Sequence, residues 1–325
     1  MQKLVGSFVK GQHMFKPYAA TLLIIGTAIS LHAQSDFLGL PVSGYLDNIS
    51  NSAAIQRNAP YIPLASMGAR KDDDRFWTKR RITMSYAYAD TSVDGNSGDI
   101  STHSGVAEVY VESRTGLSLN LAGVYSGTKR DFSTGEADTD AGGFALQPAQ
   151  ELWRFLRPGD SDSQLWLGFG GGYRAIETDF TLSAGTATTE GDSLFISPNL
   201  IYVRKITERL SGLIIPAYTM EWQNTDFGSA DVDSEASLFT LTGRGDYGVS
   251  EHVTLSGFAT WKRDIHMEID GVPSSALDCH DWAEFGGSVR VAITEDIGLR
   301  AGYSYEGLHP DFSRHKFGLR LELGF

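Results

Sequence analysis

Apolar and polar side chains alternate with a period of two along most of this chain, beginning near Arg81. Side chains on a β-strand point alternately to opposite faces, so each alternating segment predicts a strand with one apolar face and one polar face. The clearest apolar series are Ile82, Met84, Tyr86 and Tyr88; Leu117, Leu119, Leu121 and Tyr125; and Phe317, Leu319, Leu321, Leu323 and Phe325. The chain is therefore predicted to be all-β.

Counting these segments predicts twelve strands, which an antiparallel transmembrane β-barrel would arrange with apolar side chains toward lipid and polar ones toward the lumen. An even number brings both chain ends to the same side of a single-chain barrel. The fourth strand has the weakest pattern. Its continuation, Pro148–Leu156, has apolar residues at helix-like spacing and is either strand or helix, which leaves ten strands as the alternative. The predicted strands are residues 81–90, 104–112, 116–127, 138–146, 163–177, 192–204, 209–223, 236–248, 252–263, 282–293, 297–306 and 314–325.

A soluble β-sandwich would alternate in the same way, but the connections favour a membrane barrel. Short turns at 113–115, 205–209, 249–252 and 294–296 follow the second, sixth, eighth and tenth predicted strands. On the other side we predict polar loops of about ten to eighteen residues, which is the outer-membrane arrangement. These loops would follow strands that end near Asp90, Gly127, Glu177, Gln223 and Arg263.

Aromatic residues lie near the predicted strand ends, as expected for two girdles at the membrane interfaces. The loop-side girdle would contain Tyr88, Tyr125, Tyr173, Trp222, Trp261 and Tyr305, and the turn-side girdle Tyr202, Tyr247 and Phe325. Pro198 and Pro216 are expected to lie opposite each other in one hairpin and to cause a bulge or bend there, because proline cannot donate to the strand ladder.

Residues 1–33 are predicted to be a cleaved signal peptide. Three lysines and no acid precede the apolar run Tyr18–Ser30, and Leu31–Ala33 offers a cleavage site. About 13 apolar residues are too few to span a bilayer as a helix. Met14 is an alternative start to Met1. Residues 34–79 form a short lead-in segment in the periplasm or the lumen, and residues 80–325 form the barrel.

The last ten residues, KFGLRLELGF, resemble the carboxy-terminal assembly signal of bacterial outer-membrane proteins. Lys316, Gly318, Leu321, Leu323 and Phe325 match its polar, glycine, apolar and terminal aromatic positions. The resemblance implies delivery to the barrel-assembly machinery and the outer membrane of a diderm (Gram-negative) bacterium, with outer-membrane lipids and lipopolysaccharide as surroundings. The whole barrel more weakly resembles the translocator domains of autotransporters and several small-solute channels, but only a short segment precedes it.

The formal net charge of −13 argues against non-specific binding to nucleic acid, which requires a basic surface. Signal cleavage would remove three lysines and no acid. The single cysteine, Cys279, excludes an intramolecular disulfide framework. No metal site or cofactor is predicted.

Charged residues on the predicted polar faces would line the lumen, because a charge facing lipid at mid-depth costs several kcal/mol. Two interpretations stay open: charge rings that tune the selectivity of a channel, or acid–base pairs that brace a narrow barrel. The predicted lumen residues are Glu108, Glu112, Arg174, Glu221, Arg244, Asp246, Lys262, Glu284, Arg290, Arg300, Arg320 and Glu322.

Catalysis is not predicted, because no serine nucleophile motif accompanies the histidines. The residues that an enzyme would need to bring together are His266, Cys279, His280, Asp281, His309 and His315. The sequence thus predicts a non-enzymatic barrel that acts as a passive, porin-like channel for small polar solutes. The alternative is an autotransporter-like translocator or a structural barrel with a closed lumen.

Overall fold

The computed structural model describes residues 77–93, 100–132, 135–152, 156, 162–182, 185–226, 231–269, 272–273, 281–307 and 312–324. The predicted signal peptide, most of the predicted lead-in segment and Phe325 lie outside these ranges. No helix within them is long and apolar enough to cross a membrane.

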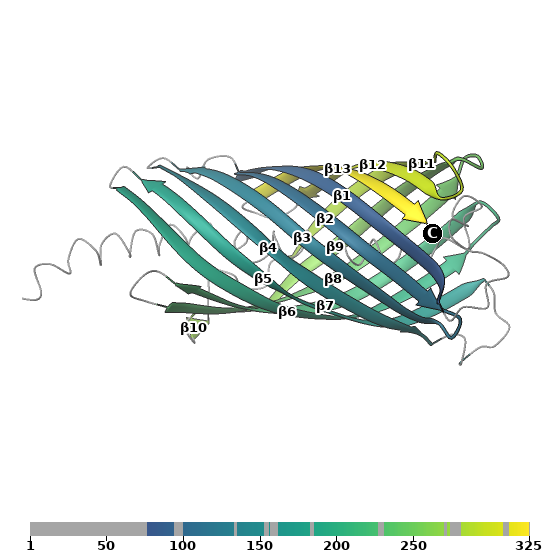
Figure 1. Cartoon of the computed structure of the whole chain (residues 1–325), viewed down its shortest axis with the longest axis horizontal. Coiled ribbons are helices and arrows are strands. Elements are labelled where there is room, and N and C mark those ends of the chain that lie inside the picture. Colours follow the sequence, from purple (N-terminus) through teal and green to yellow (C-terminus); the bar gives the residue numbers. More distant parts are fainter. Residues whose placement is uncertain are drawn as a thin grey trace, which may run out of the picture.

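Antiparallel strands form one closed barrel of twelve strands, tilted relative to its long axis (Figure 1). The first and last strands close it, with Arg81 opposite Gly324 and Val93 opposite Phe312. The two-residue strand β10 (Val272–Pro273) only extends β9. The barrel strands are β1 (Trp77–Val93), β2 (Ile100–Ser113), β3 (Leu117–Phe132), β4 (Gly135–Glu151), β5 (Ser163–Leu182), β6 (Gly185–Lys205), β7 (Leu210–Asp226), β8 (Asp231–Gly248), β9 (Val253–Ile269), β11 (Asp281–Ala292), β12 (Ile297–Gly307) and β13 (Phe312–Gly324).

All twelve predicted strands are present, and the ten-strand alternative is wrong. β4 is continuous through Pro148 to Glu151, so the first part of the Pro148–Leu156 segment is strand. The barrel begins at Trp77, slightly before the predicted start at residue 80.

The loops of ten residues or more predicted on one side are wrong for four of the five hairpins. Only residues 133–134 separate β3 from β4, 183–184 separate β5 from β6, 227–230 separate β7 from β8, and 94–99 separate β1 from β2. Polar segments such as Thr186–Glu190 continue the ladder beyond the length needed to cross lipid, because a strand in water needs no apolar face. The β5–β6 hairpin enters β6 at Gly185, whose φ of 138° suits glycine.

The two faces of the wall differ as the alternation predicts. On β1, Met84 is 53% exposed on the outer face and its neighbour Thr83 is 1% exposed on the inner face. The predicted girdle residues that the structure describes all lie on the outer face, exposed or half-buried. Because the outer face of a membrane barrel contacts lipid, these exposed apolar side chains form its lipid-facing belt.

The expectation for the two prolines is wrong. In the β6–β7 pairing Asn199 lies opposite Ala217, and the same register holds from Glu190 to Lys205 without a bulge. This register centres the turn on Glu208 instead of Thr207, so Pro198 and Pro216 are offset by two positions. Each proline keeps its register with the other neighbouring strand: Pro198 lies opposite Phe169 on β5, and Pro216 lies opposite Leu241 on β8. The missing backbone donor of each proline therefore does not displace its strand.

Gly143 lies at a point where β4 and β5 approach closely. A Cβ at this position would be 2.1 Å from the Tyr173 carbonyl oxygen and 2.9 Å from the Arg174 Cα. Gly143→Ala is therefore expected to lower the free energy of unfolding by about 1–3 kcal/mol, because backbone atoms must move. Urea unfolding in detergent or vesicles would measure it. Gly123→Ala is the matched control, since its Cβ would meet nothing within 4 Å; equal losses in both variants would contradict the steric argument.

Candidate functional site

Polar and charged side chains are buried on the inner face of every barrel strand. The twelve residues predicted to line the lumen all lie on this inner face. Eleven of them are buried, and Arg320 is half-buried. Eleven of the twelve belong to three ionic groups, which are described below. Glu112 accepts a hydrogen bond of 2.7 Å from the Tyr110 hydroxyl.

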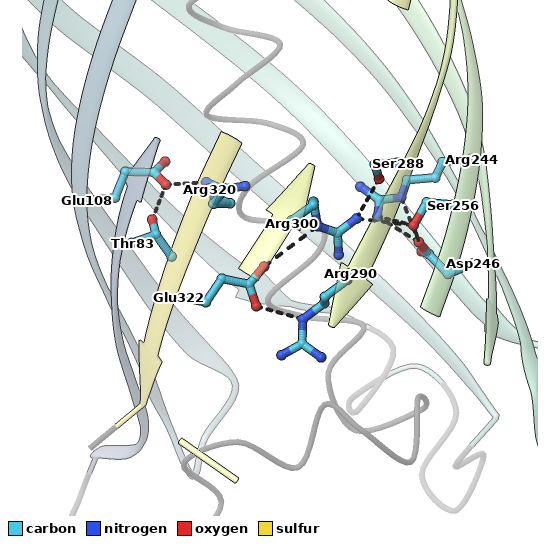
Figure 2. Close-up of polar contacts among 10 residues, drawn as sticks. All are labelled: Thr83, Glu108, Arg244, Asp246, Ser256, Ser288, Arg290, Arg300, Arg320 and Glu322. Carbon is cyan, nitrogen blue, oxygen red and sulfur yellow. Dashed lines mark hydrogen bonds and ion pairs between the residues drawn. The ribbon is translucent and has the colours of Figure 1, made fainter. Parts of the chain in front are cut away.

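The first group, which we call the arginine cluster, lies toward the turn side of the barrel (Figure 2). β1, β8, β11, β12 and β13 each contribute one arginine to it, and β2, β8 and β13 each contribute one acid. Its charged members are Arg81, Arg244, Arg290, Arg300 and Arg320, with Glu108, Asp246 and Glu322.

Two of these arginines converge on one hydroxyl group. Arg244 Nη2 is 3.0 Å and Arg300 Nη1 is 3.1 Å from Ser256 Oγ, and Arg300 Nη1 also donates to Ser288 Oγ at 3.0 Å. Arg244 in addition holds Asp246 Oδ1, at 2.9 Å from Nε and 2.6 Å from Nη2. Figure 2 shows contacts from both guanidinium groups to Ser256.

The acids of the arginine cluster are shared between strands. Glu322 accepts a hydrogen bond of 2.8 Å from Arg290 Nε, and its other oxygen lies 3.7 Å from Arg300 Nε. Glu108 accepts hydrogen bonds from Thr83 and Arg320. Gly298 makes room for this arrangement, because a Cβ there would be 3.0 Å from Arg290 Nη2.

The second group, which we call the lysine network, lies further toward the loops. Lys262 Nζ lies 2.9 Å from a Glu284 oxygen and 2.8 Å from a Glu306 oxygen. Lys316 bridges the same two acids at 3.1 and 2.8 Å, and Arg314 reaches Glu306 at 3.2 Å. Three cations and two carboxylates thus join β9, β11, β12 and β13.

The third group is a pair that spans three strands. Arg174 on β5 contacts Glu221 on β7, and its Nε donates to Ser193 Oγ on β6 at 3.1 Å. Both side chains are buried. The pair connects strands that are not hydrogen-bonded to each other, so it braces the wall.

Apolar side chains cover part of the inner face between β4 and β7, which the sequence analysis did not predict. Trp166 is completely buried there and packs in a cluster with Ala149, Ile201, Val203, Leu213 and Ile215. We call this group the apolar wall. The signal for it is present in the runs Leu200–Val203 and Leu213–Ile215, which are apolar on both faces instead of one.

The sequence analysis also missed three buried residues: Arg81, which belongs to the arginine cluster, and Glu306 and Arg314, which belong to the lysine network. Counting by twos from Arg300 reaches Glu306, and counting by twos from Arg320 reaches Arg314. Lys316 was predicted only as part of the assembly signal, but its side chain belongs to the lysine network. Gly318 lies on the same inner face as Lys316, whereas Leu321 and Leu323 lie on the outer face. The role of these residues in assembly remains a prediction.

The residues that an enzyme would need are not brought together in the described ranges. His315 lies on the outer face, 2.7 Å from the Tyr303 hydroxyl, and His266 is exposed beside Glu268. Cys279, His280 and His309 lie outside the described residues. No group of three or more histidine, cysteine or acidic side chains in the described ranges could hold a metal ion.

An exposed ion pair at the loop-side end gives a contrast with the buried groups. Lys129 Nζ lies 2.8 Å from a Glu136 oxygen, with about half of each side chain exposed to solvent. The hydrogen bond to Glu136 raises the pKa of Lys129.

No protein-family model matches the sequence, and no curated protein matches it. Solved structures do match. The translocator domain of the autotransporter NalP from Neisseria meningitidis aligns with a TM-score of 0.58 and 13% identity, over 85% of this chain and 98% of that one. An outer membrane channel from Pseudomonas putida F1 aligns with a TM-score of 0.56 and 15% identity, over 78% and 99%. The transport unit of the autotransporter AIDA-I from Escherichia coli aligns with a TM-score of 0.55 and 11% identity, over 83% and 99%. The fold is therefore that of outer-membrane β-barrels, both channels and translocators.

Proposed function

We propose that this chain is an outer-membrane channel for small polar solutes. The observation that supports the proposal best is the polar inner face: buried polar or charged side chains occur on the inside of all twelve strands of a closed barrel. A lipid-facing outer face and a polar inner face are the arrangement of porin-type barrels, whose interior carries the path for solutes. The chain would be exported through its cleaved signal peptide, inserted by the barrel-assembly machinery and surrounded by lipopolysaccharide in the outer leaflet.

A barrel with a closed lumen, either a translocator or a structural protein, is the second candidate. Its support is the extent of charge pairing, because each of the three ionic groups joins two or more strands through buried side chains. Acid–base pairs of this kind brace a wall whether or not solutes pass beside them.

Planar-bilayer recording of the refolded mature chain would discriminate between these candidates. Stepwise single-channel currents are expected, whereas the absence of current above bilayer leak would leave the closed barrel. Ser85 and Met84 offer matched variants, because they are neighbours on β1 with opposite faces. Ser85→Trp, on the inner face, is expected to lower the conductance by roughly half or more. Met84→Trp, on the lipid face, is expected to leave it unchanged; equal effects would argue against a path through the barrel.

A further inference from the structure

Four glycines form a row across the lipid-facing outer face of β7, β8, β9 and β11. Gly212 on β7 lies opposite Gly245 on β8. Gly245 lies opposite Gly257 on β9, and Gly257 lies opposite Gly287 on β11. Neighbouring strands are about 4.8 Å apart, so the row is about 14 Å long. We call it the glycine groove, because larger apolar side chains border it: Leu210, Tyr247, Leu255 and Val289 on the turn side, and Ile214 and Phe285 on the loop side.

Neither crowding nor backbone conformation requires glycine in the middle of this groove. A Cβ at Gly245 or Gly257 would meet no atom closer than 4.0 Å, and a Cβ at the adjacent Gly243 would meet nothing within 4 Å. None of these three glycines has a positive φ. Glycine weakens the interior of a strand, and where it occurs there it often marks the close approach of a ligand or of another backbone. The open space above these glycines therefore indicates an occupant on the outer face.

The glycine groove climbs from the turn-side edge of the lipid belt toward its middle. The distance of its glycines from the turn-side ends of their strands increases from two residues on β7 to three on β8, four on β9 and five on β11. This steady rise follows from the tilt of the strands, which Figure 1 shows. A hydrocarbon core of about 30 Å gives each leaflet about 15 Å. An acyl chain also runs from the interface toward the middle of the membrane, so the groove has the course of such a chain.

An arginine lies at the turn-side end of the groove. Arg204 is exposed on the outer face of β6, opposite Gly212 and one residue before the strand ends. Within the described ranges no acid pairs with it, whereas the adjacent Lys205 is held by Glu208 at 2.9 Å. A guanidinium group is a strong donor to phosphate oxygens. The cationic end and the apolar groove therefore follow each other in the order of a phospholipid headgroup and its acyl chain.

We propose that the glycine groove binds one anionic phospholipid of the turn-side leaflet, with an acyl chain along the glycines and the phosphate at Arg204. The short turns of an outer-membrane barrel face the periplasm, so this leaflet is the periplasmic one. The inference does not depend on conduction, because the outer face of an open barrel and that of a closed barrel contact the same lipid. A second copy of the chain is the other body that could fill the groove, and the test separates the two.

The test is native mass spectrometry of the full mature chain, refolded into vesicles of equal parts phosphatidylglycerol and phosphatidylcholine and then released in detergent. One phosphatidylglycerol per barrel is expected to remain bound. Gly245→Leu/Gly257→Leu fills the groove and is expected to lose most of the bound lipid. Arg204→Gln is expected to lower the preference for phosphatidylglycerol about fivefold, the effect of one basic residue near an anionic membrane surface. Circular dichroism checks that each variant is folded, and Arg204→Gln carries the test alone if the double variant does not fold.

Two matched variants change the same residue types elsewhere on the outer face. They are Gly123→Leu on β3, where a Cβ would also meet nothing within 4 Å, and Arg263→Gln on β9, which removes a half-exposed arginine beside Asp281. Both are expected to leave the bound lipid unchanged.

Three results would overturn the proposal. The first is an unsubstituted chain that retains no lipid, or that loses as much of it in Gly123→Leu as in the double variant. The second is equal retention of the two lipids, which would remove the role of Arg204. The third is a dimer that the double leucine variant converts to a monomer, which would identify the groove as an interface between copies of this chain.

Discussion

Lys262→Met is expected to lower the free energy of unfolding by about 3–5 kcal/mol, the range found when one partner of a buried ion pair is removed. Lys262 has no exposed surface, and its ammonium group lies between Glu284 and Glu306 at 2.9 and 2.8 Å. Methionine fills a similar volume but has no charge. The two carboxylates would then repel each other in a buried site, with only Lys316 still bridging both.

The loss can be measured by urea unfolding of the refolded barrel, followed by tryptophan fluorescence. Lys129→Met is the matched control, because the side chains of Lys129 and Glu136 are 51% and 40% exposed. An exposed pair contributes less than about 1 kcal/mol, so this variant is expected to unfold almost as the unsubstituted chain does. Similar losses in the two variants would mean that water reaches the lysine network and screens it.

The strand order and the lipid face were predictable from sequence because lipid imposes a strict requirement. Every residue that faces hydrocarbon must be apolar, and every second residue faces it, so series such as Phe317, Leu319, Leu321 and Leu323 identify both a strand and its outer face. The outer ends of β5 and β6 were not predictable in this way. They extend into water, where Thr186 and Thr188 satisfy a strand equally well without an apolar face.

The inner face was predictable only as a set of residues. Alternation shows that Lys262, Glu284 and Glu306 point inward, but not that they lie at the same depth. That depends on the register of each hairpin, as the two-residue error for Pro198 and Pro216 illustrates. The contact between Arg174 and Glu221 was even less predictable, because these residues lie on β5 and β7, with β6 between them. No periodicity in one strand reports on a partner two strands away.

The apolar wall and the arginine cluster make the inner face of the barrel unequal around its circumference. Trp166, Ile201 and Leu213 lie on β5, β6 and β7, whereas the arginines come from β8, β11, β12, β13 and β1. The inner face therefore has charge on one arc of the barrel and hydrocarbon on another, and the packing of the apolar wall decides whether the lumen is open at this level.

Trp166→Ala is expected to lower the free energy of unfolding by about 3–5 kcal/mol if the apolar wall is dry and packed, because the substitution removes a large buried side chain and leaves a cavity. Trp166 is completely buried among five aliphatic side chains from β4, β6 and β7. Urea unfolding, followed by the remaining tryptophans, measures the loss. Leu167→Ala is the control on the same strand, since Leu167 is half exposed on the lipid face and leaves no internal cavity. A loss for Trp166→Ala no larger than for Leu167→Ala would mean that water already contacts the indole, and that the lumen at this level is open instead of packed.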